Sequence, residues 1–147
     1  MGIREAAAAA KAAEEAAFKA EKKRIFQVNS QRGVETVRSL LGLEGKAVRA
    51  FNDEERQCGE GTTVELEEGV YVKVGLRPIY AASGWGGKQK IGAKPYLSLA
   101  RKDGTLRTYA EFTTLGGLST QLEETDAKDA RTAEMKAQQA ASKETAS

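Results

Sequence analysis

The residues best suited to binding chemistry lie in one glycine-rich segment, residues 83–94, which reads SGWGGKQKIGAK. Its four glycines let the backbone approach a ligand closely, its three lysines carry positive charge, and Trp85 offers a flat apolar ring. Stacking on an aromatic ring contributes about 1–3 kcal/mol per base, and lysines bind phosphates in a salt-sensitive way. This combination predicts binding of a polyanion with stackable bases. The alternative is that Trp85 folds back over a small core and leaves an ordinary hairpin loop.

Residues 70–77 read VYVKVGLR and alternate in character, as expected for a strand whose side chains point to opposite faces. The apolar face is expected to hold Val70, Val72, Val74 and Leu76, and the polar face Tyr71, Lys73 and Arg77. Sheets in small proteins often solvate one side with such residues. The Tyr/Lys/Arg face is therefore either a solvated surface or part of a binding surface.

A second pair of strands is predicted between Tyr96 and Phe112. The dipeptide Asp103-Gly104, flanked by alternating residues, is the strongest short-range signal for a two-residue hairpin. The expected cross-strand pairs are Lys102–Thr105, Ala100–Arg107, Leu99–Thr108, Ser98–Tyr109, Leu97–Ala110 and Tyr96–Glu111. In this register the leucines are expected on the face that packs inward, and the tyrosines and Arg107 on the opposite face of the sheet. The predicted nucleic-acid-binding residues are Trp85, Lys88, Lys90, Lys94, Tyr96, Arg101, Arg107 and Tyr109.

The charge distribution is more informative than the net charge of +2. Residues 46–69 carry three basic and seven acidic side chains, whereas residues 70–109 carry eight basic ones and a single acid, Asp103. Such separation can build a positive surface that attracts polyanions. It is equally consistent with direct pairing of the two segments in the fold.

Most catalytic and metal-binding chemistry is excluded by composition. The chain has no histidine and one cysteine, which removes the usual zinc sites and the Ser/His and Cys/His nucleophile pairs. The acids Asp53, Glu54, Glu55 and Glu60 do not follow the Ca²⁺ loop pattern and are expected to form a solvated loop. Residues 82–89 lack the first glycine and the final Ser/Thr of a phosphate-binding loop. We expect no enzymatic activity, no metal and no cofactor.

Helices are predicted at both ends of the chain. Residues 4–28 are rich in the helix formers Ala, Glu and Lys, and they offer mainly alanine for burial. Asn29 and Ser30 are good N-cap residues, and apolar positions at helical spacing predict a separate helix over residues 30–41. Leu115, Leu118 and Leu122 predict a short closing helix. From Glu123 onward a frayed helix running into disorder is expected.

Together these elements predict an α+β fold: a small antiparallel sheet of four to five strands packed with one or two short helices and flanked by Ala-rich helical extensions. Strands are expected near residues 46–51 and 63–66 in addition to those above, and Pro78 should end its strand or lie at a sheet edge. The predicted domains are an extension over residues 1–29, a core over residues 30–122 and a low-complexity tail over residues 123–147.

Two functions remain open at this stage. The first is non-enzymatic nucleic-acid binding, largely independent of base sequence, with single-stranded DNA or RNA preferred over duplex. The second is a structural or adaptor subunit of a virion or ribonucleoprotein particle, in which protein partners order the terminal helices. The single Cys58 and the lack of an apolar run of about 18 residues lead us to expect no membrane partner and a cytoplasmic or intraparticle location.

Overall fold

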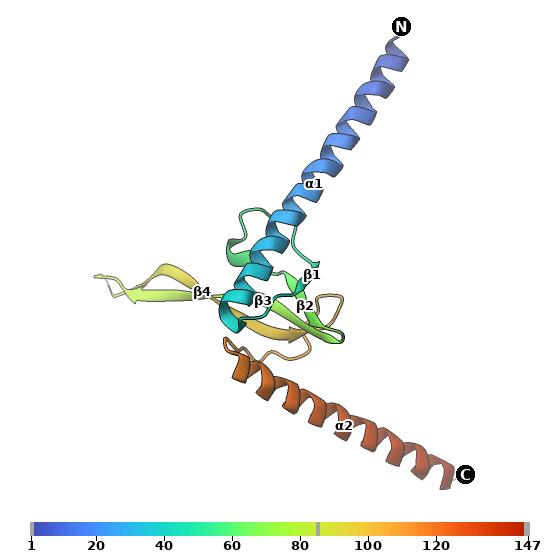
Figure 1. Ribbon diagram of the computed structural model, residues 1–147, viewed down its shortest axis with the longest axis vertical. Coiled ribbons are helices and arrows are strands. Elements are labelled where there is room, and N and C mark those ends of the chain that lie inside the picture. Colours follow the sequence, from blue (N-terminus) through green and yellow to red (C-terminus); the bar gives the residue numbers. More distant parts are fainter. Residues whose placement is uncertain (1, 85, 146–147) are drawn as a thin grey trace.

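The chain folds as a small antiparallel sheet with a long helix at each end (Figure 1). The structure is a computed structural model, and it describes residues 2–84 and 86–145. Its four strands lie in the order β1-β2-β3-β4. The elements are α1 (Ile3–Leu41), β1 (Lys46–Arg49), the short 3-10 turn η1 (Gln57–Gly59), β2 (Thr63–Glu67), β3 (Val70–Ala82), β4 (Lys88–Ala100) and α2 (Leu115–Thr145). The predicted α+β class with terminal helices is confirmed.

The core forms where one face of the sheet meets the C-terminal half of α1. Val72 and Val74 on β3 lie opposite Leu99 and Leu97 on β4, and all four are buried. The predicted inward orientation of the two leucines is therefore confirmed. The sheet packs against apolar side chains from both helices and from the segment before α2: Val37, Leu41, Phe112 and Leu118.

The two N-terminal helices predicted from the sequence are one continuous helix, so the predicted start at Asn29 is wrong. Asn29 is fully buried inside α1, and its side-chain amide donates hydrogen bonds to the carbonyls of Phe51 and Asp53. The Asn29 side chain, which could have capped a new helix, instead bonds two backbone carbonyls of a distant loop. The helix therefore continues through Asn29 without a break. The predicted closing helix likewise continues as α2 through the tail to Thr145.

Backbones approach closely where α1 crosses the segment before β2. A Cβ on Gly33 would lie 2.5 Å from the Cβ of Thr62, and one on Gly59 would lie 2.1 Å from the backbone nitrogen of Gly33. One turn further along α1, the Thr36 hydroxyl donates to the carbonyl of Cys58 at 2.6 Å. This side of α1 therefore packs directly against the backbone of the segment before β2, because Gly33 has no side chain and Thr36 supplies a hydrogen bond.

The hairpin predicted between Tyr96 and Phe112 has a different turn and register. The backbone N–H of Arg101 donates to the carbonyl of Thr105 at 2.8 Å, which leaves a three-residue loop that ends in Gly104 at φ 89°. Ala100 therefore faces Leu106 rather than Arg107, and Leu97 faces Phe112 rather than Ala110. The extra loop residue shifts the pairing. The Arg107 N–H still donates to the Leu99 carbonyl at 2.9 Å, but residues 108–111 leave the ladder, so the return segment forms only isolated bridges.

The principal partner of β4 is β3, and these two strands extend well beyond the rest of the sheet. Pairing between β2 and β3 ends at Thr63 and Lys73, whereas β3 and β4 remain paired as far as Ala82 and Lys88. Residues 75–84 and 86–95 thus lie in a two-stranded projection, which we name the arm (Figure 1). Pro78 lies within it, where β3 has no neighbour on its second side, and this confirms its predicted edge position.

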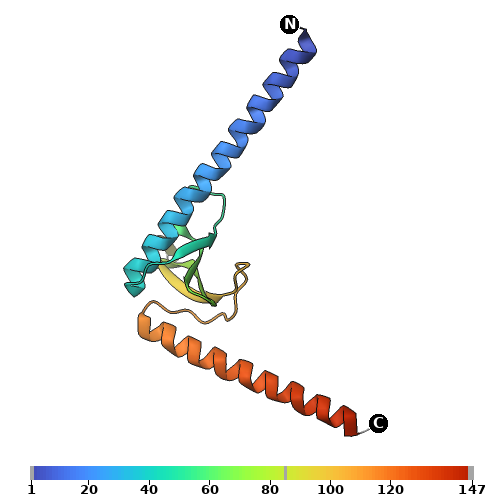
Figure 2. The ribbon, with the colours of Figure 1, turned by 45° about the vertical axis from the view of Figure 1, so that its right-hand side comes forward.

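Both helices extend past the sheet, as Figure 2 shows. Residues 3–24 of α1 and residues 126–144 of α2 are exposed throughout, including Phe18 at 63%. Among the described residues, no helix is long and apolar enough to cross a membrane.

The contact between α1 and the segment before β2 predicts an unusual effect of a glycine substitution. Alanine is normally the better helix former by about 1 kcal/mol. At Gly33 the added methyl group meets Thr62, and we expect Gly33→Ala to lower the free energy of unfolding by about 1–3 kcal/mol. Gly116→Ala, where the nearest such atom is 4.0 Å away, should have little effect or stabilise slightly. Urea unfolding measures both, and an unchanged or higher midpoint for Gly33→Ala would contradict the close contact.

Candidate nucleic-acid interface

The arm carries positive charge that no acid within it balances. Residues 75–95 include Arg77, Lys88, Lys90 and Lys94 and no aspartate or glutamate. The three lysines are exposed, and none forms an ion pair with any residue that the structure describes. Arg77 differs, because it forms an ion pair with Glu111. The free charge of the arm is therefore concentrated on its lysines.

The pleat distributes these lysines over both faces of the arm. Lys94 lies opposite Arg77, while Lys90 lies opposite Tyr80 and Lys88 opposite Ala82. Paired residues share a face, and odd and even positions of β3 point to opposite faces. The register shift between Ile79 and Tyr80 produces this arrangement, because positions 88, 90 and 94 of a regular strand would share one face. Lys88 and Lys90 therefore lie on one face and Lys94 on the other.

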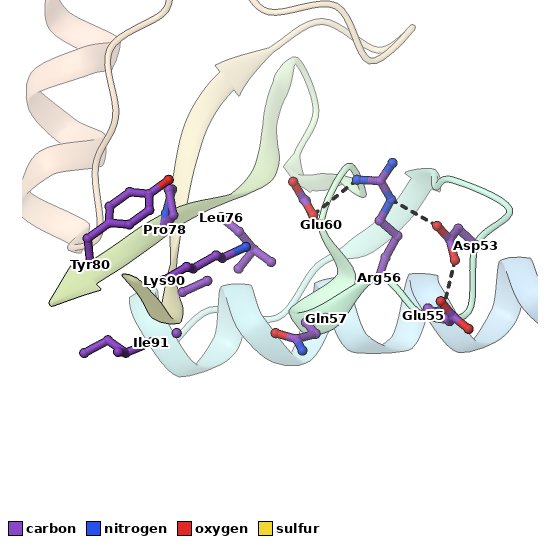
Figure 3. A pocket seen from close by; sticks show the side chains of 12 residues that line it. Asp53, Glu55, Arg56, Gln57, Glu60, Leu76, Pro78, Tyr80, Lys90 and Ile91 are labelled. Atoms are coloured by element: carbon purple, nitrogen blue, oxygen red, sulfur yellow. Dashed lines mark hydrogen bonds and ion pairs between the residues drawn. The ribbon is translucent and has the colours of Figure 1, made fainter. Parts of the chain in front are cut away.

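An open cleft of about 700 Å³ separates the base of the arm from the loop that carries Asp53, Glu55 and Glu60, which we name the acidic loop (Figure 3). Leu76, Tyr80 and Lys90 form the arm wall, and the loop wall includes Asp53 and Glu60. These two acids pair with Arg56 of their own loop, at 3.3 and 3.2 Å. Within the described parts of the chain, no ion pair joins an acid of residues 46–69 to a base of residues 70–109. The acidic and basic segments face each other without direct neutralisation.

The other predicted site residues are spread over the molecule. Tyr96 packs over the backbone of Gly75, where a Cβ would lie 2.4 Å from the ring carbon Cζ. Arg101 donates to Leu106 and Thr105 within its own turn, and Arg107 forms an ion pair with Asp129 of α2. Tyr109 is 90% exposed, outside any strand. Trp85 lies outside the described residues.

These positions do not gather into one aromatic platform. Lys88 and Arg101 are 13 positions apart, which corresponds to roughly 40 Å along an extended chain. The arm groups only Lys88, Lys90 and Lys94, on two faces, and Tyr96 lies next to its base. The described part of the predicted site is thus a two-sided basic projection.

One aromatic site was missed by the sequence analysis. Phe51, 47% exposed, lies near Arg56 and Lys73, whose charged groups are 5.1 and 5.8 Å from its ring centroid. Its ring lies against Gly61, where a Cβ would come within 1.8 Å of it. Phe51 and Leu106 line a hollow of about 320 Å³ over the polar face of the sheet. In the sequence the only signal for this site is the glycine at position 61, whose φ is positive in the structure. The sequence does not reveal that the ring of Phe51 packs on this glycine.

The remaining polar face is partly covered rather than open. Ser98 is buried, and the phenol of Tyr71 donates a hydrogen bond to Glu65, which raises the pKa of that tyrosine. The turn at residues 101–105 is tethered to the sheet, because Arg49 donates to the Asp103 carbonyl at 2.5 Å and Lys73 to the Gly104 carbonyl at 3.1 Å. This face therefore presents less free charge than its composition indicates.

The Asp103 side chain organises that turn and gives a pH-dependent prediction. Its carboxylate accepts hydrogen bonds from the Thr105 hydroxyl at 2.7 Å and the Thr105 N–H at 2.9 Å, and these bonds lower the pKa of Asp103. A lowered pKa stabilises the fold above the ordinary aspartate value, and this contribution is lost as the pH falls through the folded-state pKa. Thr105→Val should therefore raise the pKa of Asp103 and reduce the loss of folding stability at acidic pH.

An NMR titration of the Asp103 carboxyl carbon measures the shift directly. Thr113→Val, at an exposed threonine outside this turn, is a matched control that should leave the titration unchanged. An unaltered Asp103 pKa in Thr105→Val would show that the hydroxyl hydrogen bond does not stabilise the charged carboxylate.

The described residues contain no cluster of three or more His, Cys, Asp or Glu side chains that could hold a metal ion. In the part of the chain that the structure describes, the arm is the one projecting element that carries exposed lysines of the predicted set without ion-pair partners. Comparison with models of known protein families, with curated proteins and with solved structures finds no match for this chain.

Proposed function

We propose that this chain is a non-enzymatic nucleic-acid-binding protein that contacts phosphates through the lysines of its arm. The observation that carries the proposal is the combination of projection and unpaired charge at Lys88, Lys90 and Lys94. Exposed cations on a protruding element reach a polyanion without desolvating the core, and each contact releases counterions from the nucleic acid. Recognition of this kind is largely independent of base sequence.

The choice between single strands and duplex depends on stacking. The sequence-based expectation of single strands rests on Trp85, Tyr96 and Tyr109 as stacking rings. Tyr96 packs on Gly75, and Tyr109 lies away from the arm ladder. The charge-based part of the proposal therefore stands independently of the stacking part.

Salt dependence tests the charge-based part. Removing two phosphate contacts should flatten the slope of log affinity against log salt by about 1.4 units on single strands and about 1.8 units on duplex DNA. Lys88→Ala/Lys90→Ala is the test variant. Lys11→Ala/Lys19→Ala, with the same charge change on the exposed part of α1, is the matched control and should keep the original slope. Fluorescence anisotropy with labelled oligonucleotides measures both.

Two outcomes would contradict the proposal. Absence of binding to any oligonucleotide at low salt would exclude nucleic-acid binding by the isolated chain. Equal slopes for the two double variants would exclude the arm as the contact surface.

A second candidate function is favoured by the terminal helices. Ala-rich helices derive most of their stability in proteins from packing, yet residues 3–20 and 131–144 are exposed throughout. Small side chains also allow another helix to approach closely. A structural or adaptor subunit of a large particle, virion or ribonucleoprotein, would use these helices as attachment points for protein partners.

Truncation separates the two functions. Arg24 bonds Glu54, and Arg107 bonds Asp129, so removal of residues 1–20 and 131–147 leaves both contacts in place. The adaptor function predicts that the truncated chain no longer sediments with its native particle, while its oligonucleotide affinity stays within about twofold because the arm is intact. Sucrose-gradient sedimentation from the source cells measures the first quantity. Retention of the doubly truncated chain in the particle fraction would exclude the adaptor function of the helices.

A further inference from the structure

The arm is basic, and among its described residues the large exposed apolar side chains are Tyr80 and Ile91. Its distal part has small side chains at most positions that are not lysine, including Ala81, Ala82, Gly92 and Ala93, and three glycines lie at or beside its tip. Gly92 has open space where a Cβ would be, and its φ lies outside the left-handed region. Gly92 pairs with Ile79 directly beside the register shift, and its lack of a side chain leaves the face of the arm open there.

The dimensions of the arm match a groove of double-stranded DNA. Paired strands lie about 4.8 Å apart, and the eight residues of β3 from Gly75 to Ala82 extend over about 26 Å. The major groove of B-form DNA is about 12 Å wide and 8.5 Å deep and admits a two-stranded ribbon, whereas the minor groove is only about 6 Å wide. A ribbon with small side chains and projecting lysines is suited to the wider groove.

The charge arrangement supplies the second argument. A ribbon standing on its edge in a groove turns its two faces towards the two phosphate backbones. Lys88 and Lys90 lie on one face and Lys94 lies on the other, so each wall can meet a lysine. A ribbon that served a single strand would need cations on one face only.

We propose that the arm inserts edge-on into the major groove of double-stranded DNA, with lysines on both faces contacting the two flanking phosphate backbones. This inference rests on the proposed nucleic-acid-binding function and names its substrate class. A-form RNA is disfavoured, because its major groove is deep and too narrow for side chains to read.

The acidic loop limits how far the arm inserts. Asp53, Glu55 and Glu60 line the cleft at the base of the arm, on the side of Tyr80 and Lys90 (Figure 3). Arg56 pairs with two of these acids, which leaves a net negative loop wall facing any approaching phosphate. Repulsion there opposes phosphate on the cleft side of the arm base, whereas Lys94 lies on the opposite face and does not line the cleft.

Thickening the arm tests the insertion. Gly92→Leu adds a side chain on the Lys94 face, and Ala82→Leu adds one on the Lys88 face, without changing charge. Each should weaken binding to duplex DNA by about fivefold or more and leave binding to a single strand of the same sequence within about twofold. Gly116→Leu, at an exposed glycine of α2, is the control and should change neither affinity.

Groove ligands provide a second measurement on the unaltered chain. Methyl green, which occupies the major groove, should displace the protein from duplex DNA, and netropsin, which occupies the minor groove, should not. Duplex RNA of the same sequence should bind more weakly than duplex DNA. This measurement decides the question even if a thickened arm fails to fold.

The outcomes separate this inference from the function on which it rests. Tighter binding to single strands than to duplex, displacement by netropsin alone, or wild-type duplex affinity in both leucine variants would overturn groove insertion while leaving lysine-dependent binding intact. No binding to any of the three nucleic acids would overturn both.

Discussion

The contact between α1 and the segment leading into β2 is the constraint on which the rest of the structure depends. Asn29 and Thr36 bond loop carbonyls from within the helix, and Gly33 lets Thr62 and Gly59 approach. Buried backbone groups of an irregular loop need partners, and here helix side chains provide them. The loop is thereby fixed, and with it the ring of Phe51 over the sheet and the acids that face the arm.

The arm exists because the sheet is short on one side. β2 ends its pairing at Thr63, Val74 still exchanges backbone hydrogen bonds with Thr62 and Gly61, and from Gly75 onward β3 pairs only with β4. A two-stranded ribbon alone is marginally stable in water, so the arm depends on the packing of Val72 and Leu99 against α1 at its base. Its outer residues bury little and present their charges outward. The halves of β3 and β4 that pack against α1 therefore stabilise the fold, and the halves that form the arm are largely exposed.

Several arginines of the sheet and its loops form ion pairs with nearby acids, whereas the arm lysines form none with the described acids across the cleft. Arg56 neutralises acids within its own loop, and Arg77 and Arg107 are paired with Glu111 and Asp129. The arm lysines form no ion pair with any described residue, although an acidic wall faces the base of the arm across the cleft. The open separation weakens the attraction between the two walls, so the arm lysines keep a positive potential.

The sequence by itself determined what depends on local pattern: the α+β class, the inward faces of Val72 and Leu97, and the concentration of cations between residues 70 and 109. Alternation and helix propensity act between near neighbours, and a sequence displays them directly. The continuity of α1, the three-residue loop ending at Gly104, and the release of the arm from β2 were decided only by tertiary structure. Each depends on which distant group bonds Asn29 or pairs with β4, and such choices leave no local signal.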